Sequence, residues 1–150
     1  MTARLRSFGL TIVERLRSFR CAAAGIAFML RTQRNARIHL IVTSAVLATG
    51  WRLGLSGADW RWIMVAIVLV WLAETMNTAF EFVCDVVSPQ FHISVRTAKD
   101  VAAGAVLICS GGAVVIGLLT FWPYLPLPTG VLRMMVAAPP LIPLWAVTAL

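Results

Sequence analysis

The stretch WIMVAIVLVWLAETMNTAFEFV, residues 62–83, decides the fold class of this chain. Its length of about twenty residues and its apolar character are typical of a helix that crosses a membrane. It nevertheless carries Glu74 and Glu81, and a carboxylate inside such a segment is costly and indicates a functional site by default. The two glutamates lie two helical turns apart, so they project from one face of the helix. Three further polar residues share this face: Asn77, Thr78 and Asp85.

The composition of the whole chain indicates an integral membrane protein. Of its 150 residues, 60% are hydrophobic and 13% are charged. The formal net charge of +7 would suit a nucleic-acid partner, but eight basic residues are arginines between Arg4 and Arg37, ahead of the first apolar span. Membrane topology explains that distribution better, with the N-terminus in the cytoplasm, and we expect no nucleic-acid partner.

Three apolar segments predict an all-α bundle of three transmembrane helices. They cover residues 38–55, residues 60–87, and the stretch from Lys99-Asp100 to Trp122. With a cytoplasmic N-terminus, three spans place the polar turn at residues 88–94 on the cytoplasmic side as well. The row of carboxylates therefore opens toward the cytosol. The three cysteines have no metal-ligand spacing, and we interpret them as buried thiols: Cys21, Cys84 and Cys109.

The segment over residues 1–37 is predicted to be an amphipathic helix on the membrane surface. Its apolar residues recur at spacings of three or four with arginines between them: Leu5, Phe8, Ile12, Leu16 and Phe19. Its arginines suit anionic headgroups, and phosphate contacts are the alternative.

The remaining residues divide into a three-helix core and a C-terminal extension. Residues 38–122 form the predicted three-helix core, and residues 123–150 form a proline-rich hydrophobic extension. A fourth span within this extension is disfavoured, because Pro139, Pro140 and Pro143 remove amide donors and interrupt a helix.

The polar face of residues 74–85 is suited to a metal-bound polyphosphate. Magnesium usually takes one or two carboxylates together with phosphate oxygens. Glu81 lies about 10 Å nearer the cytosol than Glu74 along the helix. Glu81 can therefore meet the metal with a nucleotide, while Glu74 can meet a hydroxyl that arrives within the bilayer. Glu74 is the candidate general base.

The beginning of the next helix adds a cation to this site. Lys99, the only lysine of the chain, is a suitable point charge for phosphate, and Asp100 could orient it or help to hold the metal indirectly. The sequence has no Walker A motif, so helix faces would have to supply any nucleotide site.

Simpler interpretations stay open for several of these residues. Asn77 and Thr78 would also serve to join helices by hydrogen bonds. Asp85 and Asp100 lie near helix ends and would also serve as solvated boundary charges. His39 is interpreted as an interfacial or packing histidine.

Three motifs resemble the small prokaryotic diacylglycerol kinase and undecaprenol kinase family: ETMNTAFEFVCD at residues 74–85, the FH pair of the following turn, and AKDVAAGAVL at residues 98–107. The resemblance covers about residues 19–121, and the upstream AAAGI and TQRNARIHL stretches are also similar. It implies a lipid kinase of the bacterial inner membrane that depends on ATP and Mg²⁺. It also implies three transmembrane helices with a surface helix, a homotrimer with cytoplasmic active sites, and diacylglycerol or undecaprenol as the acceptor.

Carried over by position, the resemblance implies a role for each polar residue. Glu74 is the general base, Glu81 is the ligand of the nucleotide-bound metal, and Lys99 and Asp100 bind the nucleotide. Arg17 falls near the lipid and phosphate entrance. Supporting polar residues and the nucleotide loop complete the set: Asn77, Asp85, Gln90, Phe91 and His92. By itself His92 is equally a plain loop residue.

One residue departs from the family pattern. Gln33 stands where the family normally has a glutamate that joins the metal and nucleotide site. Glutamine keeps a carbonyl oxygen for Mg²⁺ but loses the charge, so reduced metal affinity is expected. Two rival functions follow from the sequence: a catalytically impaired scaffold of the same fold, and an ion or proton transporter that uses the buried carboxylates and has no need of Lys99.

Overall fold

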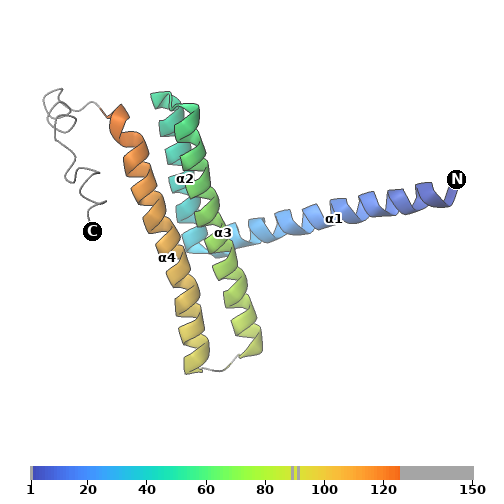
Figure 1. The fold of residues 1–150 in the computed structure, drawn as a ribbon. Coiled ribbons are helices and arrows are strands. Elements are labelled where there is room, and N and C mark those ends of the chain that lie inside the picture. The colour runs from blue at the N-terminus through green and yellow to red at the C-terminus, as the bar shows by residue number, and fades with distance from the viewer. Residues whose placement is uncertain (1, 89, 91, 126–150) are drawn as a thin grey trace, which may run out of the picture.

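The computed structural model describes residues 2–88, 90 and 92–125, and these residues are all helical or in short turns. The elements follow in order: α1 (Thr2–Thr32), α2 (Arg34–Leu53), α3 (Gly57–Val87), α4 (Ile93–Phe121) and the short 3₁₀ helix η1 (Trp122–Tyr124). Helices α2, α3 and α4 form a bundle, and α1 runs away from it at a steep angle (Figure 1). The predicted all-α class is confirmed.

A single residue separates α1 from α2. The amide of Gln33 donates to the Met29 carbonyl at 2.8 Å, and its own backbone is extended, with φ −93° and ψ 123°. The bundle helix therefore begins at Arg34, four residues before the predicted start of the first apolar segment. The predicted boundary between residues 37 and 38 thus falls inside α2, because one extended residue at position 33 suffices to redirect the chain.

The connection between α2 and α3 is short and capped at both sides. Gly54 ends α2 in the left-handed conformation at φ 67°, which favours glycine, and its amide donates to the Trp51 carbonyl at 3.2 Å. The hydroxyl of Ser56 then accepts from the Asp59 amide at 3.3 Å at the start of α3. These caps turn the chain back within four residues.

The α3–α4 turn begins at Ser88, whose amide donates to the Cys84 carbonyl at 3.0 Å. Residue 89 is a proline, which disfavours helix at the residue before it. His92 caps α4, because its Nδ1 accepts from the Ser94 amide at 3.2 Å. Helix α4 thus begins at Ile93, and the charged residues that the sequence placed ahead of the third span lie inside the helix.

Two helices are long and apolar enough to cross a membrane: Gly57–Val87 and the helical stretch Ile93–Tyr124. Their outward faces expose large apolar side chains, including Val68 at 62%, Ile108 at 76% and Leu119 at 71%. Contiguous apolar surface of this kind is unfavourable in water and suits lipid or another protein. Helix α2 does not meet the same criterion of length and hydropathy among the described helices; it carries three arginines over its 20 residues.

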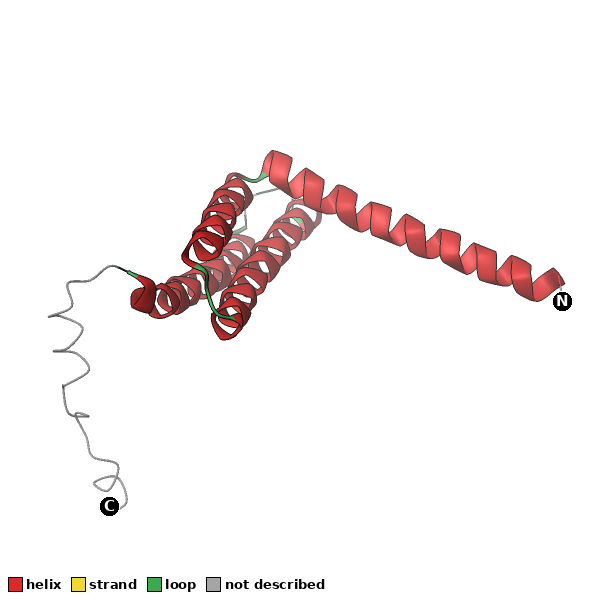
Figure 2. Cartoon of the chain, turned by 90° about the horizontal axis from the view of Figure 1, so that it is seen from above, coloured by secondary structure: helices red, strands yellow, loops and turns green. Residues whose placement is uncertain are grey.

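Helix α1 contacts the bundle near its C-terminal end (Figure 2). The ring centroids of Phe28 on α1 and Phe82 on α3 lie 5.4 Å apart, and Met29 is buried. Upstream of this contact Phe19 is 74% exposed. Cys21 on α1 is exposed as well, so its interpretation as a buried thiol is wrong.

The other cysteines and the end of α4 complete the described fold. Cys84 is buried, as predicted, whereas Cys109 is only half-buried. At η1 the Tyr124 hydroxyl donates to Asp59 Oδ2 at 2.6 Å and accepts from the Ser56 amide at 3.1 Å. This contact joins the end of α4 to the beginning of α3. Most of the predicted extension, from residue 126 onward, lies outside the described residues.

Candidate active site

Glu74 is the most deeply buried large side chain of the described chain, with 1% of its surface exposed. Its Oε2 atom has no hydrogen-bond partner among the described residues. A buried polar atom without a partner costs about 1–3 kcal/mol, and more when it is charged. Native proteins keep few such atoms, and they are frequently functional. Glu74 therefore has the properties expected of a residue that binds a ligand.

The predicted polar face of α3 is confirmed at Asn77, Thr78 and Glu81, one to two turns beyond Glu74. The Asn77 amide nitrogen donates to Glu81 Oε1 at 3.2 Å, while the Asn77 carbonyl oxygen and the Thr78 hydroxyl are buried without partners in the described structure. The hydrogen bond of Asn77 stays within α3, so the alternative that Asn77 and Thr78 join helices finds no support here. Glu81 is half-buried, which leaves it nearer the surface than Glu74.

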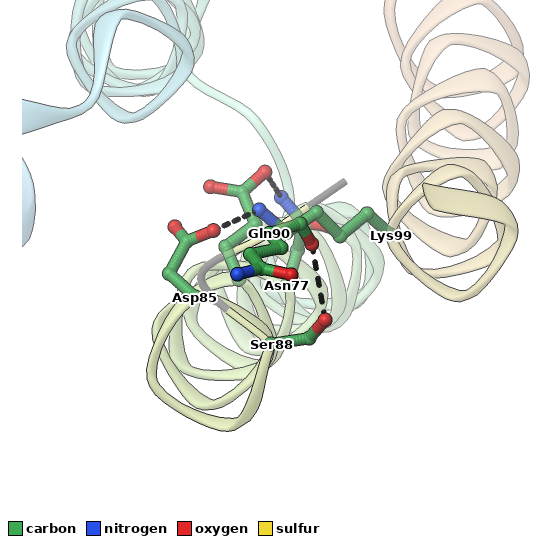
Figure 3. A network of polar contacts seen from close by, with 6 residues as sticks. Asn77, Asp85, Ser88, Gln90 and Lys99 are labelled. Carbon is green, nitrogen blue, oxygen red and sulfur yellow. Dashed lines mark hydrogen bonds and ion pairs between the residues drawn. The ribbon is translucent and has the colours of Figure 1, made fainter. Parts of the chain in front are cut away.

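Lys99 on α4 and Asp85 on α3 form an ion pair (Figure 3). The Lys99 side chain is 31% exposed and that of Asp85 is 64% exposed. Asp85 is therefore not a free boundary charge. Asp100 instead lies 4.0 Å from Arg96 Nε, one turn away, and both side chains are exposed. Such an exposed pair contributes little to stability.

The turn between the two helices lies beside this ion pair (Figure 3). Ser88 Oγ donates to the Gln90 backbone carbonyl at 3.1 Å, and His92 is engaged as the cap of α4. Phe91 lies outside the described residues. The turn thus places Gln90 and His92 at the same end of the hairpin as Lys99.

Two predicted residues are not part of this cluster in the described chain. Gln33 lies at the α1–α2 corner, where its side chain makes no capping hydrogen bond. Arg17 is exposed on α1, about 22 Å of helix from the C-terminal end of that helix. Because α1 runs away from the bundle (Figure 1), this separation keeps Arg17 away from α3 in the described chain. Their assigned roles stay predictions.

No group of three or more His, Cys, Asp or Glu side chains that could hold a metal occurs among the described residues. Glu81 is the half-buried carboxylate of the polar face, and its Oε1 already accepts from Asn77. A site with one carboxylate suits Mg²⁺ when phosphate oxygens and water supply the other ligands.

The structure adds polar residues that the sequence did not single out. Asn35 on α2 and Ser110 on α4 line a cavity of about 190 Å³ together with Asn77. The Trp71 indole on α3 also donates to the Thr43 hydroxyl on α2 at 3.1 Å. The spacing of Asn35, His39 and Thr43 on one face of α2 is the signal that could have identified the α2 residues among them.

These features define the chain as a helical membrane protein. Its polar site lies on α3 and extends toward the turn between α3 and α4. The chain belongs to the prokaryotic diacylglycerol kinase family, whose sequence profile matches residues 20–121. The resemblance drawn from the motifs is thus confirmed.

Two relatives illustrate the similarity. The chain is 38% identical to undecaprenol kinase from Bacillus subtilis over 109 residues, which cover 73% of this chain and 89% of the relative. It is 40% identical to diacylglycerol kinase from Synechocystis sp. over 101 residues, which cover 67% of this chain and 58% of that relative. The second match therefore spans less than two thirds of that relative.

Proposed function

We propose that this protein transfers the γ-phosphoryl group of ATP to the hydroxyl group of a membrane lipid, either diacylglycerol or undecaprenol. The observation that carries the proposal is the buried Glu74 carboxylate, whose Oε2 has no partner in the described chain and which shares a helix face with Asn77 and Glu81. Family membership and the names of the two relatives support the same reaction class.

Glu74 acts as the general base in this proposal. Its carboxylate accepts the proton of the lipid hydroxyl while the lipid oxygen forms a bond to the γ-phosphorus. The bond between that phosphorus and the oxygen of the ADP leaving group breaks in the same transfer. Burial of Glu74 supports this role, because water is excluded from the point of proton transfer.

The nucleotide lies toward the turn of the hairpin, beyond Glu81. When bound, Mg²⁺ neutralises charge on the phosphates, and Glu81 with Gln33 would hold it. Lys99 supplies a positive charge to the phosphates, and Asp85 orients its ammonium through their ion pair. Asp100, Gln90, Phe91 and His92 complete the nucleotide site in this proposal.

The membrane arrangement follows from charge and length. Helices α2, α3 and α4 span the inner membrane with the N-terminus in the cytoplasm, and α1 lies on the membrane surface. Helix α2 is 20 residues long, which is sufficient for a span when its terminal arginines reach the interfaces. The exposed Leu16 and Phe19 on α1 support contact with lipid.

The protein assembles as a homotrimer in this proposal. The exposed apolar faces of α3 and α4 supply surface for packing between copies. Arg17 and Gln33, which one chain does not gather around Glu74, would then approach the active site of a neighbouring copy.

Phosphate transfer from labelled ATP tests the function directly. Purified protein in mixed micelles would be offered diacylglycerol and undecaprenol side by side, with Mg²⁺ or with excess EDTA. We expect a labelled lipid product with Mg²⁺ that is absent with EDTA and absent for Glu74→Gln. A folded protein that labels neither lipid would instead favour the impaired scaffold, for which the loss of charge at Gln33 is the motivating observation. Ion flux through vesicles without ATP turnover would favour the transporter.

A further inference from the structure

Two cross-helix contacts fix how α2 lies against α3. The Trp71 indole on α3 donates to the Thr43 hydroxyl on α2 at 3.1 Å. Nearer the α3–α4 turn, Asn35 of α2 and Asn77 of α3 line one cavity. The short connection at residues 54–56 makes the two helices antiparallel, and they pack side by side (Figure 1). A step toward the beginning of α2 is therefore a step toward the end of α3.

His39 and Glu74 lie between these two contacts. On α2, His39 lies four residues before Thr43, which is about 6 Å along the helix. On α3, Glu74 lies three residues after Trp71, which is about 4.5 Å along that helix. The next step of the same length on each helix leads to the two asparagines. Because a helix presents the same face every three or four residues, this register places His39 level with Glu74.

The His39 side chain faces the interior of the bundle. It is half-buried and lines a cavity of about 390 Å³ between α2, α3 and α4. The same cavity is lined on α3 by Ile67 and Val70, which lie one and two turns before Glu74 on its own helix face. His39 also lies within electrostatic range of Glu74. The cavity thus leaves the imidazole ring room to turn toward the carboxylate.

Glu74 has an acceptor atom to which a donor can be added, since its buried Oε2 has no partner in the described chain. Two charged groups of the described chain act on it: His39 from α2 and Glu81 from α3. The α4 residues that line the two cavities are all uncharged, and α1 reaches α3 at Phe82, two turns beyond Glu74. An ionised Glu81 can only accept, whereas an imidazole ring can donate an N–H. His39 is therefore the group that suits Oε2.

We propose that His39 is a positioning residue for Glu74. A ring N–H of His39 donates to Glu74 Oε2 and holds the carboxylate so that its other oxygen accepts the proton of the lipid hydroxyl. This inference rests on the proposed kinase function and adds a residue of α2 to the machinery on α3. A packing histidine is the alternative, and it requires only that the ring fill space in the bundle.

Substitutions at position 39 separate the two roles. His39→Phe keeps a ring of similar size and removes both nitrogens. We expect it to lower kcat about tenfold with the KM for ATP unchanged, because only the hydrogen bond to the base is lost. His39→Gln, whose amide can still donate, should recover most of this loss. His39→Leu is a second variant without nitrogen and should behave as His39→Phe does.

Val46→Ala is the matched control. Val46 is half-buried like His39 and lines the same cavity from α2, so its truncation removes packing without changing a polar group. Its kcat per folded molecule should match that of the unmodified protein. A double substitution adds a second check. When Glu74 is already glutamine, His39→Phe should not lower the residual rate further, because the interaction between the two side chains is gone.

The pH dependence of kcat provides a readout that packing alone would not change. In His39→Phe the acidic limb of the profile should move to higher pH by about one pH unit, because the carboxylate loses a donor that stabilises its charged form. In Val46→Ala the limb should stay in place. Equal values of kcat for His39→Phe and the unmodified protein, or a loss without any movement of the limb, would leave His39 a packing residue.

Infrared spectroscopy of the protein without substrates keeps the inference separate from the reaction. The C=O stretching band of protonated Glu74 is identified by its absence in Glu74→Gln. We expect this band to appear at higher pH in His39→Phe than in the unmodified protein, and at the same pH in Val46→Ala. If neither lipid is phosphorylated but the band moves in this way, the kinase function fails and the pair of His39 and Glu74 stands. If a lipid is phosphorylated and the band does not respond to His39→Phe, only the pair fails.

Discussion

Lys99 on α4 pairs with Asp85 on α3 across the turn that joins the two helices. The pair joins residues fourteen positions apart in the sequence and points the cation of α4 toward the polar face of α3. The pair therefore lies at the end of the hairpin where α3 turns into α4, toward which we propose that the nucleotide binds.

Removal of the Lys99 ammonium should weaken ATP binding. We expect Lys99→Ala to raise the KM for ATP about 10- to 100-fold, because a charge-assisted contact with phosphate is lost. The fold should be retained, since the pair is partly exposed and contributes little to stability. Arg61→Ala, which removes an exposed cation at the opposite end of α3, is the control. An unchanged KM for ATP would remove Lys99 from the nucleotide site.

Substitution of the buried Glu74 carboxylate should slow phosphoryl transfer while leaving ATP binding little changed. We expect Glu74→Gln to lower kcat about 100- to 10,000-fold, because an amide cannot accept the hydroxyl proton. ATP binding, followed by equilibrium dialysis, should change little. Glu14→Gln removes an exposed carboxylate on α1 and should leave both quantities unchanged. Full turnover by Glu74→Gln would exclude the assigned base.

A glutamate at position 33 should strengthen the metal site. We expect Gln33→Glu to lower the Mg²⁺ concentration needed for half-maximal activity several-fold, because a carboxylate binds Mg²⁺ better than an amide oxygen. Thr32→Glu adds the same charge one residue away, on the exposed last turn of α1, and should have a smaller effect. Identical Mg²⁺ titrations for Gln33→Glu and the unmodified protein would show that this corner lies outside the metal site.

The contact at the opposite end of the hairpin should affect stability and not catalysis. Tyr124 donates to Asp59 and accepts from the Ser56 amide, so Tyr124→Phe removes both hydrogen bonds. We expect the melting temperature in detergent to fall by a few degrees, with kcat per folded molecule unchanged, because η1 lies far from Glu74 along α3. Phe121→Leu offers a comparison that alters the same region without touching this network. A selective loss of kcat in Tyr124→Phe would indicate coupling between the two ends.

The polar face of α3 was predictable because helical periodicity alone places Glu74, Asn77, Thr78 and Glu81 on one side. The partner of Asp85 was not predictable, because its pair with Lys99 depends on the geometry of the turn between two helices. Asn35 and Ser110 were missed for a related reason. Neither residue stands out on its own helix. Each is recognised only because it lines one cavity with Asn77 of α3.

The amino-acid sequence by itself determined the helical class, the apolar lengths of α3 and α4 and the polar row, since these depend on local periodicity and hydrophobicity. Tertiary structure decided which polar atoms stay unpaired in the described chain, where the helix corners fall and that Asn35, Asn77 and Ser110 line one cavity. These properties depend on the packing of three helices against one another, which no single segment encodes.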